Sequence, residues 1–390
     1  MLKDISFQAV FMGLLTAFVG FASSFPVVLQ GLRSAGATEA QAASGLMAVA
    51  IAMGLSAIFL SLKSRNPIWI AWSTPGAALL ASSGMPEFGF AEAVGAFIIC
   101  GLMIIIAGLI KPLSQAISSI PQPIASAMLA GVVMSLCLAP FDAIAFDPVL
   151  GLPIFAAWVI TFLIAPRLAV PAALLAFIGV MIWGVRLPED SLDILSQAAL
   201  PQPTWITPVF TQTSFFSIAF PLFIVTMASQ NIPGLAVLKT YGYPLNPKLW
   251  FTTTGAFTVL GAPFGGHAVN LAAITAAMCA SPEAHPNKSR RYWAAVIAGV
   301  ASVAFGLLAG LITAFVTLAP SILIEAVAGL ALITTFVTAI EGAFRDEAYR
   351  LPSAVTFLLT ASGVTIAGIS GAFWGLVAGL TIVLFTSRLR

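Results

Sequence analysis

The sequence predicts an all-α polytopic membrane protein of about fourteen transmembrane segments, arranged as two inverted repeats of seven segments each. Three observations carry this prediction: the apolar composition, the positions of the basic residues, and a break in one segment of each half. Of 390 residues, 60% are hydrophobic and 8% are charged, and the mean hydropathy is +1.05. Soluble proteins contain about 25% charged residues. The composition therefore leaves almost no room for a soluble domain.

Apolar runs between clusters of glycine, proline and charged residues mark the segments. The first seven runs cover residues 7–32, 40–62, 67–83, 91–110, 121–138, 148–165 and 168–184. The second seven cover residues 206–237, 247–260, 262–279, 292–318, 320–341, 353–369 and 371–387. We therefore divide the chain into a first repeat (1–184), a polar connecting loop (185–204) and a second repeat (205–390). Because several runs abut closely, about twelve or thirteen segments is the alternative count.

The basic residues test this count, because lysine and arginine gather in the short cytoplasmic loops of membrane proteins. With fourteen segments and a cytoplasmic N-terminus, only Arg33 and Arg186 of the 16 basic residues fall outside. The inner side holds the others: Lys3, Lys63, Arg65, Lys111, Arg167, Lys239, Lys248, Lys288, Arg290, Arg291, Arg345, Arg350, Arg388 and Arg390. A shifted count would scatter this pattern. The charges thus predict that both termini are cytoplasmic.

The third segment of the first half is broken by the sequence Asn-Pro-Ile-Trp-Ile-Ala-Trp-Ser-Thr-Pro-Gly at 66–76. Trp69–Trp72 is expected to be extended. Ser73 or Thr74 is suited to cap the half-helix that follows, and a proline fits the first turn of that helix. Non-helical backbone at membrane depth is tolerated only where protein buries it or where it lines a watery cavity. This break is therefore a candidate site.

The third segment of the second half is broken by Gly-Ala-Pro-Phe-Gly-Gly-His at 261–267. Glycine and proline disfavour a continuous helix here, and we expect a helix to restart at His267 and to include 268–278. Because each half has an odd number of segments, the second half enters the membrane upside down relative to the first. This is the inverted-repeat plan of secondary transporters, with the two breaks in matching positions.

Two half-helices that start near the bilayer midplane create a positive potential that suits an anionic group. The aromatic faces of Trp72 and Phe264 are placed to hold a planar ring, so a carboxylate on an aromatic ring is the expected guest. Simple packing of these aromatic side chains is the alternative. The substrate-binding candidates are Trp72, Ser73, Thr74, Gln230, Asn231, Phe264, Gly266, His267 and Asn270.

Gln230 and Asn231 form a polar pair inside the apolar eighth segment. Amides in a membrane helix are costly unless they are paired, so they lie in helix contacts or in a cavity. We expect Gln230 to bind the substrate and Asn231 to support it; glue between helices is the alternative. Asn270 follows His267 by three residues, a spacing that places both on one face of the expected helix.

His267 and Glu325 are the candidates for proton coupling. An unperturbed imidazole has a pKa of about 6.5, so its charge changes near physiological pH. A neutral His267 that donates a hydrogen bond to the substrate is the alternative. For Glu325, an ordinary place at the end of a helix is the alternative.

Two motifs resemble the benzoate:proton symporter family of bacterial inner membranes. They are Ile-Ala-Trp-Ser-Thr-Pro-Gly at 70–76 and Ala-Pro-Phe-Gly-Gly-His-Ala-Val-Asn-Leu-Ala-Ala-Ile-Thr at 262–275. The resemblance covers essentially the whole chain, and it extends more distantly to the uracil-permease and sulfate-permease transporters. It implies a core domain of segments 1–4 and 8–11 that moves against a gate domain of segments 5–7 and 12–14.

In the nucleobase permeases of this wider group, acidic residues on the eighth segment and at the start of the tenth half-helix hold the substrate. The positions that resemble them here are Gln230 and His267, so both acids are absent. A carboxylate would repel a benzoate anion, whereas an amide or an imidazole would not. The departure favours an anionic substrate, and it leaves the proton route of those relatives without a counterpart.

We therefore expect a secondary active transporter of the bacterial inner membrane. It would import benzoate or a similar aromatic carboxylate with protons, by alternating access around the two half-helices. Its expected partners are the substrate, protons and membrane lipids, with no cofactor, metal ion or nucleic acid; a homodimer is left open. The alternative is a carrier for another planar or anionic solute, such as a nucleobase or an inorganic anion, without proton coupling. A channel is a further alternative, and a membrane enzyme is disfavoured because no HExxH pair or carboxylate cluster is present.

Overall fold

A computed structural model describes residues 5–110, 120–185, 188–272, 275–367 and 369–388. Within these ranges the chain is mostly helical and contains two small two-stranded sheets. Of the basic residues in the charge pattern, Lys3, Lys111, Arg186 and Arg390 lie outside the described ranges, as do residues 273–274 of the second motif.

The first half consists of helices, one strand and one short turn. They are α1 (Phe7–Ala22), α2 (Phe25–Ser34), α3 (Glu39–Ser64), β1 (Ile70–Trp72), α4 (Thr74–Ser83), α5 (Phe90–Leu109), α7 (Gln122–Phe146), α8 (Pro148–Ile164), the 3-10 turn η2 (Pro166–Leu168) and α9 (Ala169–Gly184). Local sequence sets the helix starts. Thr38 and Gln41 form a reciprocal capping box at α3, and the Asp147 carboxylate accepts from the first amides of α8.

The region between the two halves contains α10 (Ser191–Ala198) and an extended segment. A helical stretch from Gln212 to Thr240 follows, in which two π turns interrupt the α geometry. Its parts are α11 (Gln212–Ser214), η3 (Phe215–Ala219), α12 (Phe220–Thr226), η4 (Met227–Asn231) and α13 (Ile232–Thr240). The second π turn ends two residues before Pro233, which cannot supply an amide hydrogen to a regular helix.

The remaining elements complete the second half. They are α14 (Pro247–Gly261), η5 (Ala262–Phe264), β2 (Val269–Leu271), α15 (Ala276–Ala280), η6 (Lys288–Arg290), α16 (Tyr292–Leu307), α17 (Ala309–Thr317), α18 (Ser321–Phe344), η7 (Glu347–Tyr349), α19 (Arg350–Ala361), β3 (Thr365–Ile366), β4 (Ile369–Ser370) and α20 (Gly371–Arg388). Strand β1 pairs with β2, and β3 pairs with β4, both antiparallel.

Seven helices of the described chain are long and apolar enough to cross a membrane, judged by length and composition. An eighth crossing results if the pair Lys288–Leu307 and Ala309–Thr317, bent by 52°, is one segment. Pro148–Ile164 and Gly371–Thr386 are shorter apolar helices. The chain is thus a multi-pass membrane protein, and the count of about fourteen segments stays a prediction.

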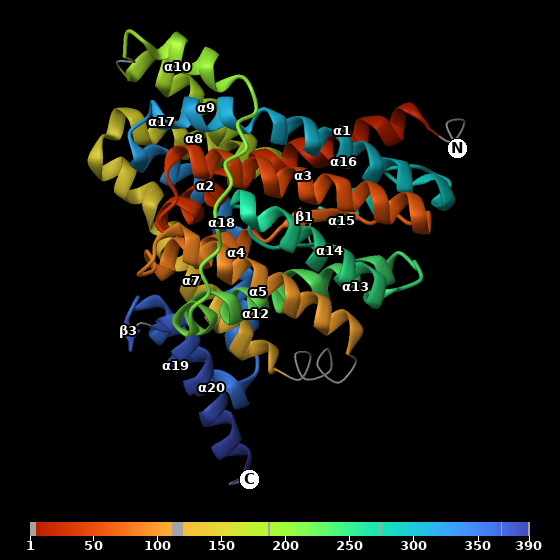
Figure 1. Cartoon of the computed structure of the whole chain (residues 1–390), viewed down its shortest axis with the longest axis vertical. Helices are drawn as coiled ribbons and strands as arrows, with labels where there is room; N and C mark the ends of the chain where they lie inside the picture. Colours follow the sequence, from red (N-terminus) through yellow and green to blue (C-terminus); the bar gives the residue numbers. More distant parts are fainter. Residues whose placement is uncertain (1–4, 111–119, 186–187, 273–274, 368, 389–390) are drawn as a thin grey trace.

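Glycines allow close crossings between the two halves. A side chain on Gly54 of α3 would lie 2.5 Å from the carbonyl oxygen of Gly299 on α16, and one on Gly299 would lie 2.7 Å from that of Gly54. Gly101 of α5 and Gly255 of α14 approach each other in the same reciprocal way. In Figure 1, α1, α3 and α16 lie alongside one another, and α19 and α20 lie at the end of the molecule opposite α10.

The connecting loop is longer than predicted, because the eighth segment begins at Gln212 and not at 206. Three prolines between residues 201 and 208 prevent an earlier helix start. In Figure 1 this yellow-green segment runs along the molecule from α10 to α12. The amide of Ile206 donates to Pro263 O at 2.7 Å, and that of Val209 donates to Ala91 O at 2.9 Å. The loop is thus tied to both halves of the chain.

Two other predicted helices are wrong in part. The thirteenth segment was predicted to be apolar and continuous to residue 369, but α19 ends at Ala361 and a hairpin of β3 and β4 follows. Gly363 adopts a φ of +65° here, a conformation that ends a helix. The predicted helix at 268–278 is also wrong: it contains strand β2, and only Ala276–Ala280 is helical among its described residues. Pairing with β1 outweighs the local helix propensity of this apolar stretch.

Candidate functional site

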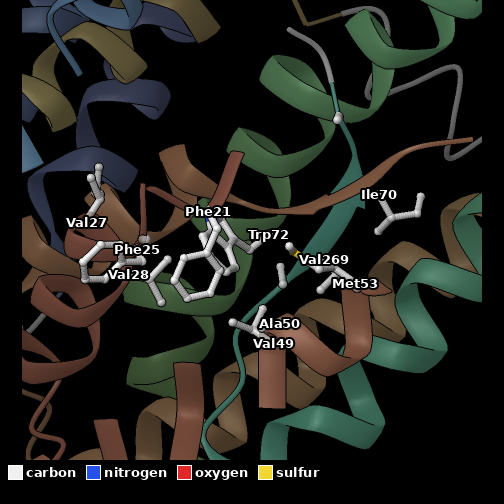
Figure 2. Close-up of a cluster of buried hydrophobic side chains, with 14 of the residues drawn as sticks. Phe21, Phe25, Val27, Val28, Val49, Ala50, Met53, Ile70, Trp72 and Val269 are labelled. Atoms are coloured by element: carbon white, nitrogen blue, oxygen red, sulfur yellow. The ribbon is translucent and has the colours of Figure 1, made fainter. Parts of the chain in front are cut away.

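The two breaks of the chain meet in a short antiparallel sheet. Ile70 pairs with Leu271, and Trp72 pairs with Val269. The ladder extends at both ends through Ser73 N to Ala268 O at 2.9 Å and Ala272 N to Trp69 O at 3.0 Å. Because a membrane interior offers no water to unpaired backbone groups, each extended break supplies the partner that the other one needs. Figure 2 shows Ile70, Trp72 and Val269 among buried side chains of α1, α2 and α3.

Side chains satisfy the outer edge of β2. The amide of Val269 donates to Thr258 Oγ1 of α14 at 3.1 Å, and the amide of Leu271 donates to Asn231 Oδ1 at 2.9 Å. Asn231 is fully buried and its Nδ2 also approaches Met227 Sδ at 3.2 Å. Asn231 therefore holds the strand in place. Its side chain is directed at the backbone and is not among the cavity-lining residues.

The half-helix after β1 begins as the sequence predicts, with Ser73 as its cap. Ser73 Oγ accepts from Gly76 N at 3.1 Å and lies 2.8 Å from Thr226 Oγ1. Pro75 occupies the first turn, where its missing amide hydrogen costs nothing. The first-turn amides of any helix lack partners within the helix. Here Thr74, the first residue of α4, lines a cavity.

A cavity of about 410 Å³ lies beside the sheet. The described residues that line it come from both halves: Val19, Gly20, Ser23, Ser24, Met53, Trp69, Ala71, Trp72, Thr74, Pro75, Pro166, Arg167, Val170, Gln230, Tyr241, Ala272, Thr275, Ala277, Met278, Ser281, Glu283, Ala331, Thr334 and Thr335. Three of the predicted site residues are in this set: Trp72, Thr74 and Gln230. The cavity volume falls in the range of small-molecule sites, roughly 300–1,000 Å³.

Both tryptophans of the first break are held by hydroxyl groups. Trp72 Nε1 donates to Ser24 Oγ at 2.8 Å, and Trp69 Nε1 donates to Thr275 Oγ1 at 2.9 Å. Phe21 contacts Trp72 edge-on, with ring centroids 5.2 Å apart. Both tryptophan side chains border the cavity but are only 1% (Trp69) and 2% (Trp72) exposed, and because both indole hydrogens are already used, they offer no free donor.

Gln230 offers the free polar group. Within the described chain, its side chain makes no hydrogen bond, and it is half-buried at the cavity wall. An amide can donate to a carboxylate without adding charge to the cavity. Gln230 and Thr74 are therefore the donors best placed for a polar group of a guest.

His267 lies behind the sheet and does not line the cavity. Its Nε2 is 3.2 Å from Ser73 O, and because a carbonyl only accepts, Nε2 carries the hydrogen. Its ring meets Phe97 of α5 edge-on, with ring centroids 6.5 Å apart. Nδ1 is buried and has no partner among the described residues. His267 thus contacts the backbone at the start of α4 rather than the cavity itself.

The other predicted residues lie away from the cavity. Phe264 packs edge-on against Trp205 of the connecting segment, with ring centroids 5.4 Å apart. Gly266 is buried against α3, and Asn270 is fully buried in β2, with Nδ2 donating to Leu271 O at 2.8 Å. The predicted helical face shared by His267 and Asn270 is wrong, because the stretch is a strand. Glu325 of α18 is half-buried, and the charged groups that act on it are Arg33 and Asp142.

Sequence reasoning missed several lining residues. Ser23 and Ser24 separate α1 from α2, and Thr334 and Thr335 lie within α18. Paired hydroxyl residues inside an apolar run were the available signal, although such residues often only bond to the backbone of their own helix. Thr275 is the last residue of the second motif, but its position at the cavity wall depends on the pairing of β2.

Comparisons with known proteins identify the family and the fold of the chain. Residues 3–385 match the family model described as benzoate membrane transport protein. The chain is 40% identical over 369 residues to the inner membrane protein YdcO of Escherichia coli (strain K12), across 94% of this chain and 93% of that protein. It is 31% identical over 378 residues to the benzoate membrane transport protein of Acinetobacter baylyi, across 97% of this chain and 95% of that protein.

The fold is also found among solved structures. The transmembrane domain of a cyanobacterium bicarbonate transporter, BicA, matches with a TM-score of 0.61 and 18% identity, across 96% of this chain and 98% of that one. At this identity the match shows a common transporter fold. The family resemblance drawn from the two motifs is confirmed. The chain therefore belongs to the benzoate membrane transport protein family and is a multi-pass membrane transporter.

Proposed function

We propose that this chain is a secondary active transporter that imports benzoate or a similar aromatic carboxylate together with protons. The observation that carries the proposal is the cavity beside the paired strands. Its lining combines the buried indoles of Trp69 and Trp72 with uncharged donors from Thr74 and Gln230. An aromatic ring would lie against the indoles, and its carboxylate would lie toward the start of α4, where the helix dipole favours negative charge.

The absence of acids from the inner part of the cavity supports an anionic guest. Glu283 is the one carboxylate among the described lining residues, and its side chain is 58% exposed, at the cavity mouth. A buried acid beside a benzoate anion would repel it. Uncharged donors avoid that repulsion and need no fixed counter-ion.

We propose an inverted repeat of seven plus seven segments. The antiparallel pairing of β1 with β2 supports it, and so do the glycine crossings. The crossing of α3 with α16 joins the expected second and eleventh segments, and that of α5 with α14 joins the fourth and ninth. An inverted repeat relates these two pairs to each other. Segments 1–4 and 8–11 would form the core domain, and segments 5–7 and 12–14 would form the gate domain.

The orientation that we propose places both termini in the cytoplasm of a bacterial cell, with the chain in the inner membrane. The cavity mouth carries Arg167, and nearby loops carry Lys288 and Arg291. Because basic loops are cytoplasmic in membrane proteins, this mouth would open inward. Entry of a proton with the substrate anion would offset the membrane potential, which opposes anion import by about 2.3 kcal/mol per charge for each 100 mV.

Uptake by proteoliposomes tests the proposal. Purified protein should accumulate labelled benzoate when an inward proton gradient is imposed, and a protonophore should abolish the accumulation. Excess unlabelled benzoate should compete, whereas uracil, sulfate and bicarbonate should not. Absence of benzoate uptake would reject benzoate as the substrate. Competition by bicarbonate or uracil would favour a carrier for an inorganic anion or a nucleobase. Flux of benzoate without accumulation would indicate a channel.

A further inference from the structure

The mouth of the cavity carries two charged side chains, Arg167 and Glu283. Arg167 belongs to η2, between α8 and α9, whereas Glu283 follows α15. Arg167 Nη1 donates to Glu283 Oε2 at 3.3 Å, and the two side chains are 68% and 58% exposed. All other described lining residues are uncharged. A guest that enters or leaves through this opening therefore passes one cation and one anion.

The loop that carries Glu283 is held firmly, although its carboxylate is not. Glu283 O accepts from Gln8 Nε2 of α1 at 2.8 Å. The buried Arg291 donates to Ala280 O at 2.9 Å and to His285 O at 2.7 Å, which closes the loop on both sides of Glu283. By contrast, among the described residues the Glu283 carboxylate makes a single hydrogen bond, of 3.3 Å, to Arg167.

An exposed ion pair with one long hydrogen bond is weak, and a second carboxylate can exchange with the first. Arginine presents paired N–H groups that match both oxygens of a carboxylate, so a free aromatic carboxylate can bind more closely than Glu283 does. The described lining of the inner cavity, in comparison, contains tryptophans and neutral donors but no cation. The opening and the interior thus provide two different environments for the same anion.

We propose that Arg167 forms a second carboxylate-binding position at the cavity mouth, which an aromatic monocarboxylate occupies by displacing Glu283 as it enters or leaves. This inference rests on the proposed function. Arg167 attracts the anion, and Glu283 competes with it and keeps the position from binding the anion too tightly. Loss of Arg167 should therefore lower the apparent affinity for the substrate, whereas loss of Glu283 should raise it.

Benzoate exchange in proteoliposomes tests this position, with KM measured for Arg167→Gln, Arg167→Lys and Glu283→Gln. Arg167→Gln should raise KM about fivefold to tenfold, because the cation is lost. Arg167→Lys should raise it less, because the charge remains without the paired donors. Glu283→Gln should lower KM about twofold to fivefold. The differences should shrink when the ionic strength rises from about 0.05 M to 0.5 M.

Arg350→Gln is the matched control, because Arg350 forms an exposed ion pair with Glu347 at 2.8 Å and does not line the cavity. Its KM should equal that of the unaltered protein. Thermal unfolding and gel filtration would verify that each variant is folded.

Four results would overturn the inference. If Arg167→Gln and Glu283→Gln shift KM in the same direction, the ion pair only joins the two segments and does not bind the substrate. The same conclusion follows if the exchanged pair Arg167→Glu with Glu283→Arg restores the original KM. An unchanged KM in Arg167→Gln would show that the anion does not use this position. If the unaltered protein exchanges no benzoate, the proposed function fails, and this inference fails with it.

Discussion

The two breaks that form the sheet reach the same backbone pairing by different means. In the first, the cap is local: Ser73 closes the start of α4, a helix of ten residues. In the second, the chain passes through Gly265 at a φ of +87° and then through β2, and a helix of only five residues follows. Its strand depends on Thr258 and Asn231, which come from other elements.

Because of this difference, the two breaks contribute differently to the cavity. The first break gives Trp69, Trp72 and Thr74 to the cavity, together with the start of a half-helix of regular length. The second break gives Ala272 and Thr275 to the cavity and places His267 behind the sheet. A symmetric pair of half-helix dipoles is therefore not present in the described chain. The first break thus supplies the two indoles and the Thr74 hydroxyl of the cavity wall, and the second pairs with its backbone.

The largest effect is expected where the second break contacts α3. A side chain on Gly45 would lie 2.6 Å from Gly265 O and 2.7 Å from Leu32 Cδ1, so Gly45→Val should prevent recovery of folded protein. Gly179→Val is the control, because no atom lies within 4 Å of an added Cβ there. The yield of monodisperse protein after detergent extraction is the measurement. Similar yields for both variants would show that this contact can relax.

His267→Gln should distinguish two roles of His267, its hydrogen bond to the Ser73 backbone and proton coupling. Glutamine can still donate to Ser73 O but does not titrate, so accumulation driven by a proton gradient should fall at least about tenfold while benzoate exchange continues. Glu325→Gln, the other proton candidate, is the comparison. Unchanged accumulation in His267→Gln would assign His267 a supporting role alone. Loss of accumulation only in Glu325→Gln would move proton coupling to α18.

Asn231→Leu tests the dependence of β2 on a distant side chain. The substitution leaves the buried amide of Leu271 without its acceptor, which should lower the free energy of unfolding by about 1–3 kcal/mol. The neighbouring Gln230→Leu is the control, because it removes no hydrogen bond among the described residues. It should change KM for benzoate and leave the thermal transition nearly constant. Equal transitions for the two variants would argue against the support of β2 by Asn231.

Ser73→Ala tests the local cap of the first break. Loss of an N-cap side chain costs about 0.5–2 kcal/mol, so we expect an effect at or below that of Asn231→Leu. A double-mutant cycle with Thr226→Val would isolate the hydrogen bond between the two hydroxyl groups. If Ser73→Ala destabilises more than Asn231→Leu does, the first break depends on tertiary contacts more than its local signals indicate.

Sequence reasoning was most accurate where the determinants are local. The Ser-Thr-Pro-Gly sequence predicts the start of α4, because capping and proline geometry act within one turn. Three prolines between residues 201 and 208 disfavour an early start of the predicted eighth segment, although the apolar run from residue 206 favours one.

The stretch after His267 shows where such reasoning fails. Val269, Asn270 and Leu271 form a strand only because β1 lies opposite and because Thr258 and Asn231 reach the outer edge. These partners are distant in the chain, so no local pattern identifies them. Phe264 is a similar case: its aromatic character suggested contact with substrate, but its neighbour is Trp205.

By itself, the sequence determined that the chain lies in a membrane, that its helices are interrupted near residues 70 and 265, and which transporter family it belongs to. Composition, charge placement and short motifs are enough for these conclusions, because each depends on residues that are close together or on averages over the chain. Only the tertiary structure decided which polar residues line the cavity. His267 was as plausible a cavity residue as Gln230 until the pairing of β1 with β2 placed it against a backbone carbonyl, whereas Asn231 bonds to β2 and Gln230 lines the cavity.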